Sequence, residues 1–238
     1  IFTLCSQAAV GIFLATVLLQ FLLIFRGEDS TVEGMVIYGL STMLLAVSFL
    51  LASMGLLLAL THLGSPRRAG RAVRSFAHSW LSREIVFGLL FTFFVGLCLL
   101  AYLFPKALST SIFTALTGGT VCGITFIYSM AHVYMQRTIP NWNSRQTLAA
   151  FYLTAAGTGL LVTASGLALV TAENDPWVRS ALLLLSCSAA AAIVLQVLNQ
   201  YFSRMRAIIP DRLHPGRRTL PASPPRRFTR SSIGSSRM

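Results

Sequence analysis

Charged residues are scarce in this chain, and acidic residues are the scarcest. Asp, Glu, Lys and Arg make up 11% of its 238 residues, whereas a typical soluble domain has about 25%. Asp and Glu together number 7, while 55% of the residues are hydrophobic and the mean hydropathy is +0.70. So few charges cannot cover a water-exposed surface of ordinary polarity. The composition therefore excludes a water-soluble globular protein.

Sequence motifs for metal and nucleotide chemistry are also missing. The 4 cysteines each stand alone inside an apolar run, without CxxC spacing: Cys5, Cys98, Cys122 and Cys187. We expect them to be small buried hydrophobic residues and we expect no bound metal. The sequence has no Walker-type loop, HExxH helix or nucleophile motif, so hydrolytic or nucleotide chemistry has no support.

The chain is built mainly of long apolar runs. A helix crosses a bilayer core of about 30 Å with roughly 20 apolar residues. Six runs of suitable length lie near 1–25, 35–63, 84–104, 111–136, 147–172 and 178–203. They lack the period of two that a transmembrane β-barrel requires. We predict an all-α polytopic bundle over residues 1–206, with close helix packing at Gly119, Gly123 and 154–165.

The stretch 207–238 differs from the rest of the chain. It is rich in Arg, Ser and Pro and has few apolar residues, so we predict a basic, disordered C-terminal tail. Its positive charge would be attracted to anionic membrane lipid. A terminus without a role would have the same composition, and both interpretations stay open.

The connecting segments alternate in charge. Segments 64–83 and 137–145 are basic, as is the tail from Arg204, whereas 26–34 and 173–175 hold most of the acidic residues. Cytoplasmic loops of membrane proteins carry an excess of Lys and Arg. We therefore expect a multi-pass membrane protein with its Arg-rich face in the cytoplasm.

Two ionisable residues stand at predicted helix ends on this Arg-rich face. Glu84 opens the third predicted span, where the helix dipole or pairing with Arg83 would explain a carboxylate without any function. His62 closes the second span before Gly64 and Pro66. It would either cap the last carbonyls or exchange protons near neutral pH. Each residue alone is a weak sign of a functional site.

Their positions together are more informative. Consecutive antiparallel spans bring His62 and Glu84 to the same membrane face, and the fourth span ends there with His132 and Tyr134. Two histidines, a tyrosine and a carboxylate could therefore converge near one interface. Trp142 and Tyr134 considered alone would be interfacial anchors.

Two other functions compete with a redox site at this face. Paired histidines can ligate haem, and His62 with His132 is the pair that could hold one b-type haem, since His78 and His214 fall in a loop and the tail. A small secondary transporter or channel is the other alternative. Transporters place polar groups near the bilayer midplane, whereas the ionisable groups here gather at one face.

Short motifs give the sequence a family resemblance. His-Leu-Gly-Ser-Pro at 62–66, followed by Leu-Ser-Arg-Glu-Ile at 81–85, resembles the membrane anchor subunit of the dimethyl sulfoxide reductase family, close to the polysulfide reductase anchors. The order and spacing of the motifs agree over residues 1 to about 145. Supporting matches are Tyr134 with Pro140 and Trp142, and Phe2–Thr3 with Ser6–Ala8.

The resemblance implies a role in anaerobic respiration at the bacterial cell inner membrane. The protein would be a non-catalytic anchor that binds and oxidises menaquinol to menaquinone and carries no metal or covalently bound cofactor. Electrons would pass to an iron–sulfur subunit and then to a molybdenum-containing catalytic subunit. Quinol binding is implied for His62 and Glu84, and we add Tyr134 as a residue that could orient the ring. The loop with Arg67, Arg68, Arg71 and Arg74 would face the partner subunit or lipid. Family anchors have about eight spans, so we expect a shortened chain.

Overall fold

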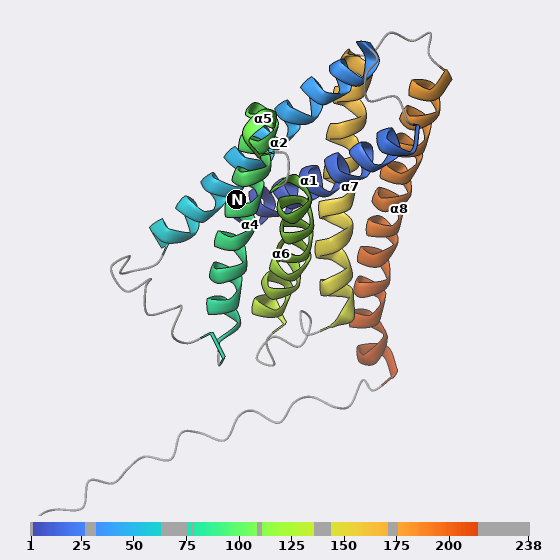
Figure 1. The fold of residues 1–238 in the computed structure, drawn as a ribbon. Helices are drawn as coiled ribbons and strands as arrows, with labels where there is room; N and C mark the ends of the chain where they lie inside the picture. The colour runs from blue at the N-terminus through green and yellow to red at the C-terminus, as the bar shows by residue number, and fades with distance from the viewer. Residues whose placement is uncertain are drawn as a thin grey trace, which may run out of the picture.

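The computed structural model is a helical bundle (Figure 1). It describes residues 2–26, 32–62, 76–77, 79–108, 111–135, 144–170 and 176–213. Its helices are α1 (Phe2–Arg26), α2 (Val32–His62), α4 (Trp80–Leu103), α5 (Pro105–Leu108), α6 (Ser111–Tyr134), α7 (Arg145–Val170) and α8 (Pro176–Leu213). Within these ranges no residue belongs to a strand. The all-α prediction is therefore confirmed.

Within the described ranges, 6 helices are long and apolar enough to cross a membrane, as predicted. Two boundaries differ from expectation. α4 begins at Trp80 rather than near 84, because the Ser79 hydroxyl accepts a hydrogen bond from the Ser82 N–H and caps the helix earlier. α8 continues to Leu213, so residues 207–213 of the predicted tail are helical. The rest of that tail lies outside the described residues.

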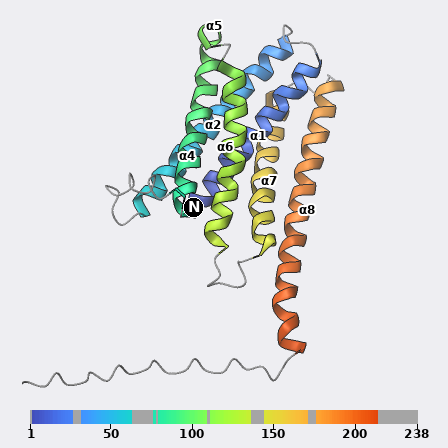
Figure 2. The ribbon, with the colours of Figure 1, turned by 60° about the horizontal axis from the view of Figure 1, so that its bottom comes forward.

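α1 occupies the middle of the bundle. It packs against α2 on one side and α7 on the other, while α4 packs against α6 and α7 against α8. Figures 1 and 2 show α1 and α2 inclined to the remaining long helices, which run roughly alongside one another. α8 lies at the edge of this arrangement.

Small residues allow α1 and α7 to cross closely, as predicted for segment 154–165. A methyl group on Gly11 or Gly159 would overlap the backbone of the opposing helix, and Ala155 lies at the same crossing. Gly119 and Gly123 have a different role, since they make room for the side chains of Phe13 and Phe91. The packing of α1 and of α4 on α6 therefore depends on rings fitting against glycines.

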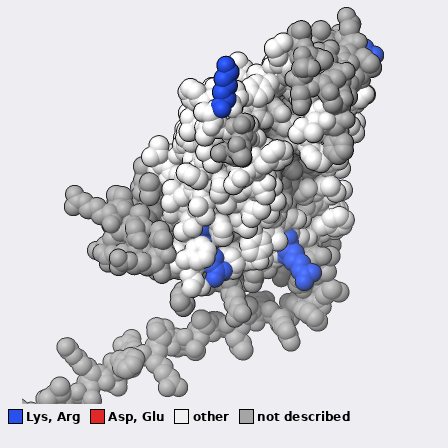
Figure 3. Space-filling model, in the orientation of Figure 1, with Lys and Arg blue, Asp and Glu red and all other residues white. Residues whose placement is uncertain are grey.

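The outer surface of the described bundle is apolar. Large side chains such as Leu183, Leu184 and Phe202 are exposed, as expected where a helix meets lipid. Figure 3 shows Lys and Arg near the two ends, with a broad uncharged zone between them. The protein is accordingly a multi-pass membrane protein.

The cysteines only partly match the expectation that all are buried. Cys98 and Cys122 are buried in the bundle, but Cys5 is half-buried and Cys187 is exposed. Cys187 is exposed because it lies on α8, whose outward face has no protein neighbour among the described residues. An apolar run in a membrane protein predicts burial in protein or contact with lipid, and only the packing distinguishes the two.

Candidate functional site

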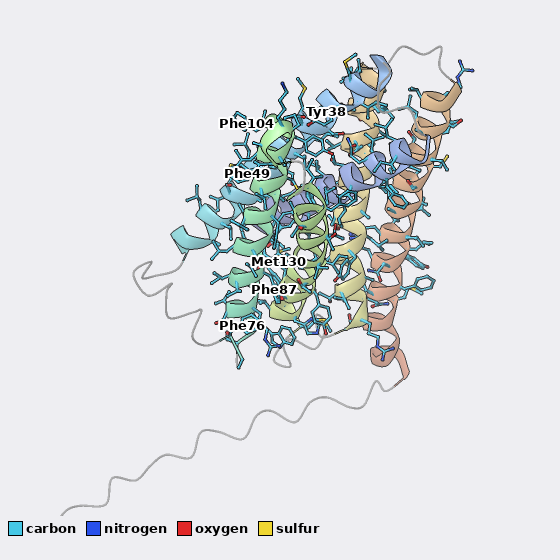
Figure 4. All side chains as sticks on the ribbon, viewed as in Figure 1. Tyr38, Phe49, Phe76, Phe87, Phe104 and Met130 are labelled. Atoms are coloured by element: carbon cyan, nitrogen blue, oxygen red, sulfur yellow. The ribbon has the colours of Figure 1, made fainter. Side chains whose placement is uncertain are left out.

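Six helix ends lie toward one end of the bundle, which we call the site end. It comprises the starts of α1, α4 and α7 and the ends of α2, α6 and α8. Figure 4 shows Phe76, Phe87 and Met130 toward this end, and Tyr38 and Phe104 toward the other. The contacts that establish it join Thr3 to Tyr134, Trp80 to His132, and Gln146 to Asn199.

Glu84 lies inside the bundle rather than at its edge. Since α4 begins at Trp80, Glu84 stands in the second turn, and its exposed fraction is only 3%. Its Oε1 atom is buried and has no hydrogen-bond partner among the described residues. The dipole effect of a helix start fades within the first turn. It therefore does not explain this carboxyl.

Arg83 is engaged elsewhere. Its Nε donates to the carbonyl oxygen of Phe76 at 3.0 Å, and one terminal nitrogen donates to that of Ala77 at 2.9 Å. The guanidinium carbon lies 4.4 Å from the centre of the Trp80 ring, a cation–π distance. The sequence left open a pairing of Arg83 with Glu84. The structure instead shows Arg83 holding the segment before α4 against the helix start.

Tyr134 lies at the site end, as predicted, and connects three helices. Its hydroxyl is 3.0 Å from the Thr3 hydroxyl on α1, and its ring centre is 5.5 Å from that of Phe151 on α7. The tyrosine thus connects the end of α6 to the starts of α1 and α7. A tyrosine held by contacts to two other helices can stabilise the shape of a binding site as well as line it.

His132 belongs to an aromatic cluster with Trp80 and Tyr128. Its ring centre lies 4.3 Å from that of Trp80 and 4.1 Å from that of Tyr128. Its Nδ1 is 2.9 Å from the Tyr128 carbonyl oxygen, which can only accept, so Nδ1 carries the proton. In neutral His132 the Nε2 atom is therefore the acceptor.

Several predicted residues cannot be placed in full. His62 is the last residue of α2, at the site end, but its side chain lies outside the described residues. The loop arginines 67, 68, 71 and 74 lie outside them too, as do Pro140 and Trp142. Quinol binding by His62, Glu84 and Tyr134 stays a prediction. No group of three or more His, Cys, Asp or Glu side chains that could hold a metal occurs within the described ranges.

Two polar residues of α1 were given no role from the sequence. Ser6 and Gln7 have exposed fractions of 1% and 4%, so both are buried close to the site end. The Ser6 hydroxyl oxygen, like Glu84 Oε1, has no hydrogen-bond partner among the described residues. The sequence feature that could have indicated these two residues is a Ser-Gln pair within two turns of a helix start in an otherwise apolar span.

Comparison with known proteins gives one matching family model and several relatives. Residues 1–209 match the family model described as DMSO reductase anchor subunit (DmsC). The protein is 32% identical over 171 residues to the anaerobic dimethyl sulfoxide reductase subunit YnfH of Escherichia coli (strain K12), covering 68% of this sequence and 60% of the relative. It is 33% identical over 164 residues to an anaerobic dimethyl sulfoxide reductase subunit of Haemophilus influenzae, covering 67% and 54%. The match thus spans less than two thirds of these relatives. No solved structure is significantly similar to this protein.

Proposed function

Because this chain belongs to the family of DMSO reductase anchor subunits, we propose that it binds menaquinol at the site end and oxidises it to menaquinone. The electrons would leave through an iron–sulfur subunit and reach a molybdenum-containing catalytic subunit. The names of the relatives describe single chains of dimethyl sulfoxide reductases, which supports a multisubunit reductase. The complex would reside in the bacterial inner membrane and serve anaerobic respiration.

Glu84 is the observation that carries the proposal. Burying an ionisable group within a membrane span is expensive, and such groups commonly mark functional sites. A buried polar oxygen without a partner also has a cost, because it has lost its hydrogen bonds to water. The hydroxyl of a bound quinol would supply the missing hydrogen bond to Glu84 Oε1.

The proposed chemistry balances with these side chains. Menaquinol gives up two electrons and two protons as its two hydroxyls become carbonyls. The ionised Glu84 carboxylate accepts the hydrogen bond of one hydroxyl and then its proton. His62 accepts the proton of the other hydroxyl, and both protons pass to the aqueous side. Tyr134, held by Thr3 and Phe151, supports the wall of the site.

The partner subunits would bind at this same end of the bundle. Arg83 and Arg145 belong to the site end, and the loop arginines 67, 68, 71 and 74 lie between α2 and α4 in the sequence. We propose that this basic segment contacts the iron–sulfur subunit or lipid phosphates. The excess of arginine supports a cytoplasmic position for the site end. A quinol near this end would then lie close to its electron acceptor.

Glu84→Gln tests the proposal in the assembled complex. The amide keeps the size of the side chain but cannot accept a proton, so we expect quinol oxidation to fall about 100-fold or more. His62→Ala should also lower the rate. The measurement is naphthoquinol oxidation by membranes in which copurification shows that the partner subunits are still attached. Unchanged turnover in Glu84→Gln would show that quinol is oxidised elsewhere.

A further inference from the structure

Ser6 differs from Ser41 and Ser129, two other buried serines of this bundle, and shares its lack of a partner among the described residues with the Thr163 hydroxyl. Ser41 donates to the Ile37 carbonyl and Ser129 to the Thr125 carbonyl, each at 2.9 Å and one turn back along its helix. Such bonds satisfy hydroxyls in transmembrane helices. The Ser6 oxygen is equally buried but has no hydrogen-bond partner among the described residues. Its hydrogen-bonding capacity is therefore available to something that enters the bundle.

The packing of α1 on α4 shows where this hydroxyl lies. The rings of Phe13 and Phe91 meet edge to face with their centres 5.5 Å apart. Ser6 precedes Phe13 by seven residues, and Glu84 precedes Phe91 by the same number. Seven residues are about two helical turns, so each polar residue lies on the same face as its phenylalanine. Since α1 and α4 both start at the site end, Ser6 and Glu84 each lie two turns nearer that end than this ring contact, on the helix faces that carry Phe13 and Phe91.

Glycines allow close helix packing near both polar residues. A methyl group on Gly55 of α2 would lie 2.7 Å from the Ser6 hydroxyl oxygen. A methyl group on Gly88, one turn after Glu84, would lie 3.0 Å from the Phe126 ring. Both distances are too short for ordinary contact, so alanine would crowd this region. The two unpartnered oxygens thus stand where the helices approach one another through glycine.

We propose that Ser6 is a positioning residue for the quinol, and that its hydroxyl and the Glu84 carboxylate hold the same quinol oxygen. The proposal rests on the quinol site proposed above. The quinol hydroxyl donates to Glu84, and the Ser6 hydroxyl donates to the lone pair of that quinol oxygen. Ser6 gains and loses no proton overall. It fixes the direction in which the quinol proton points.

Ser6→Ala in the assembled complex tests this role. The probe is 2-methyl-1,4-naphthoquinol, and KM and kcat for its oxidation are measured in membranes that retain the partner subunits. Loss of one hydrogen bond to the substrate should raise KM about three- to tenfold. Gly55→Ala, which pushes a methyl group against the Ser6 oxygen, should also raise KM. Ser129→Ala is the matched control, because this equally buried serine already donates within its own helix.

The outcomes separate this role from the proposed function. A raised KM in Ser6→Ala, with Ser129→Ala unchanged, supports the assignment. Unchanged kinetics in Ser6→Ala, while Glu84→Gln is inactive, overturns the role of Ser6 and leaves the quinol site in place. Equal losses in both serine variants, or a loss in kcat alone, also overturn it. Full activity of Glu84→Gln would instead contradict the quinol site itself.

Discussion

Polar side chains at the site end divide into those that have hydrogen-bond partners and those that have none among the described residues. Arg83 and Tyr134 have partners that hold helix ends in place. Glu84 Oε1 and the Ser6 hydroxyl oxygen are buried without partners among the described residues. Because unsatisfied polar atoms are costly, these two indicate where a polar ligand group would be stabilised at the site end; Thr163 Oγ1 and Gln196 Oε1 are the other such atoms among the described residues.

The hydrogen bond between the Thr3 and Tyr134 side chains can be tested by substituting each residue. Tyr134→Phe removes the hydroxyl, and Thr3→Val removes its partner. Each should lower the stability of the bundle by about 0.5–1.5 kcal/mol, as hydrogen bonds between transmembrane helices do. The free energy of unfolding in detergent is measured for both single variants and the double variant. Strictly additive losses would contradict a direct bond.

Among the helices, α1 is the element on which the others depend. Its Gly11 crosses α7 closely, its Phe13 packs on α4 and α6, and its Ala9 carbonyl accepts a hydrogen bond from Ser48 of α2 at 2.8 Å. A binding site formed between helices requires each helix to keep a fixed rotation about its own axis. The position of Ser6 therefore depends on packing two turns away from it.

Substitutions at the α1–α7 crossing should reveal this dependence. Gly11→Val and Gly159→Val place side chains where the opposing backbone lies, so the helices must separate. We expect a loss of stability of about 1–3 kcal/mol or more. Gly39→Ala is the control, because no atom lies within 4 Å of the added methyl group. Unfolding midpoints in detergent give the comparison, and equal midpoints for all three variants would argue against a tight crossing.

The molecule as a whole presents an apolar surface, with its described Lys and Arg side chains near its ends. This distribution suits a subunit that remains in the membrane while partners dock at one end. A transporter would instead place charged groups near the midplane.

Affinity purification of the protein from membranes tests the behaviour of the whole assembly. We expect an iron–sulfur subunit and a molybdenum-containing subunit to copurify with it. We also expect the purified protein alone to lack a Soret band, since the proposed quinol site uses no haem. Recovery of the protein without either partner would contradict the anchor role, and a Soret band would return haem ligation by His62 and His132 to consideration.

The sequence alone was sufficient for the membrane class, the six spans and the expectation that His62, Glu84 and Tyr134 belong to one end. These features follow from hydropathy and from the alternation of helix direction, which are local or one-dimensional properties. It did not indicate that Ser79 caps α4 early, that Arg83 contacts Trp80, or that the buried Ser6 hydroxyl lies against Gly55 of α2. Those facts depend on how each helix is rotated against its neighbours. The tertiary structure alone decides that rotation, because an apolar span can present any face to lipid.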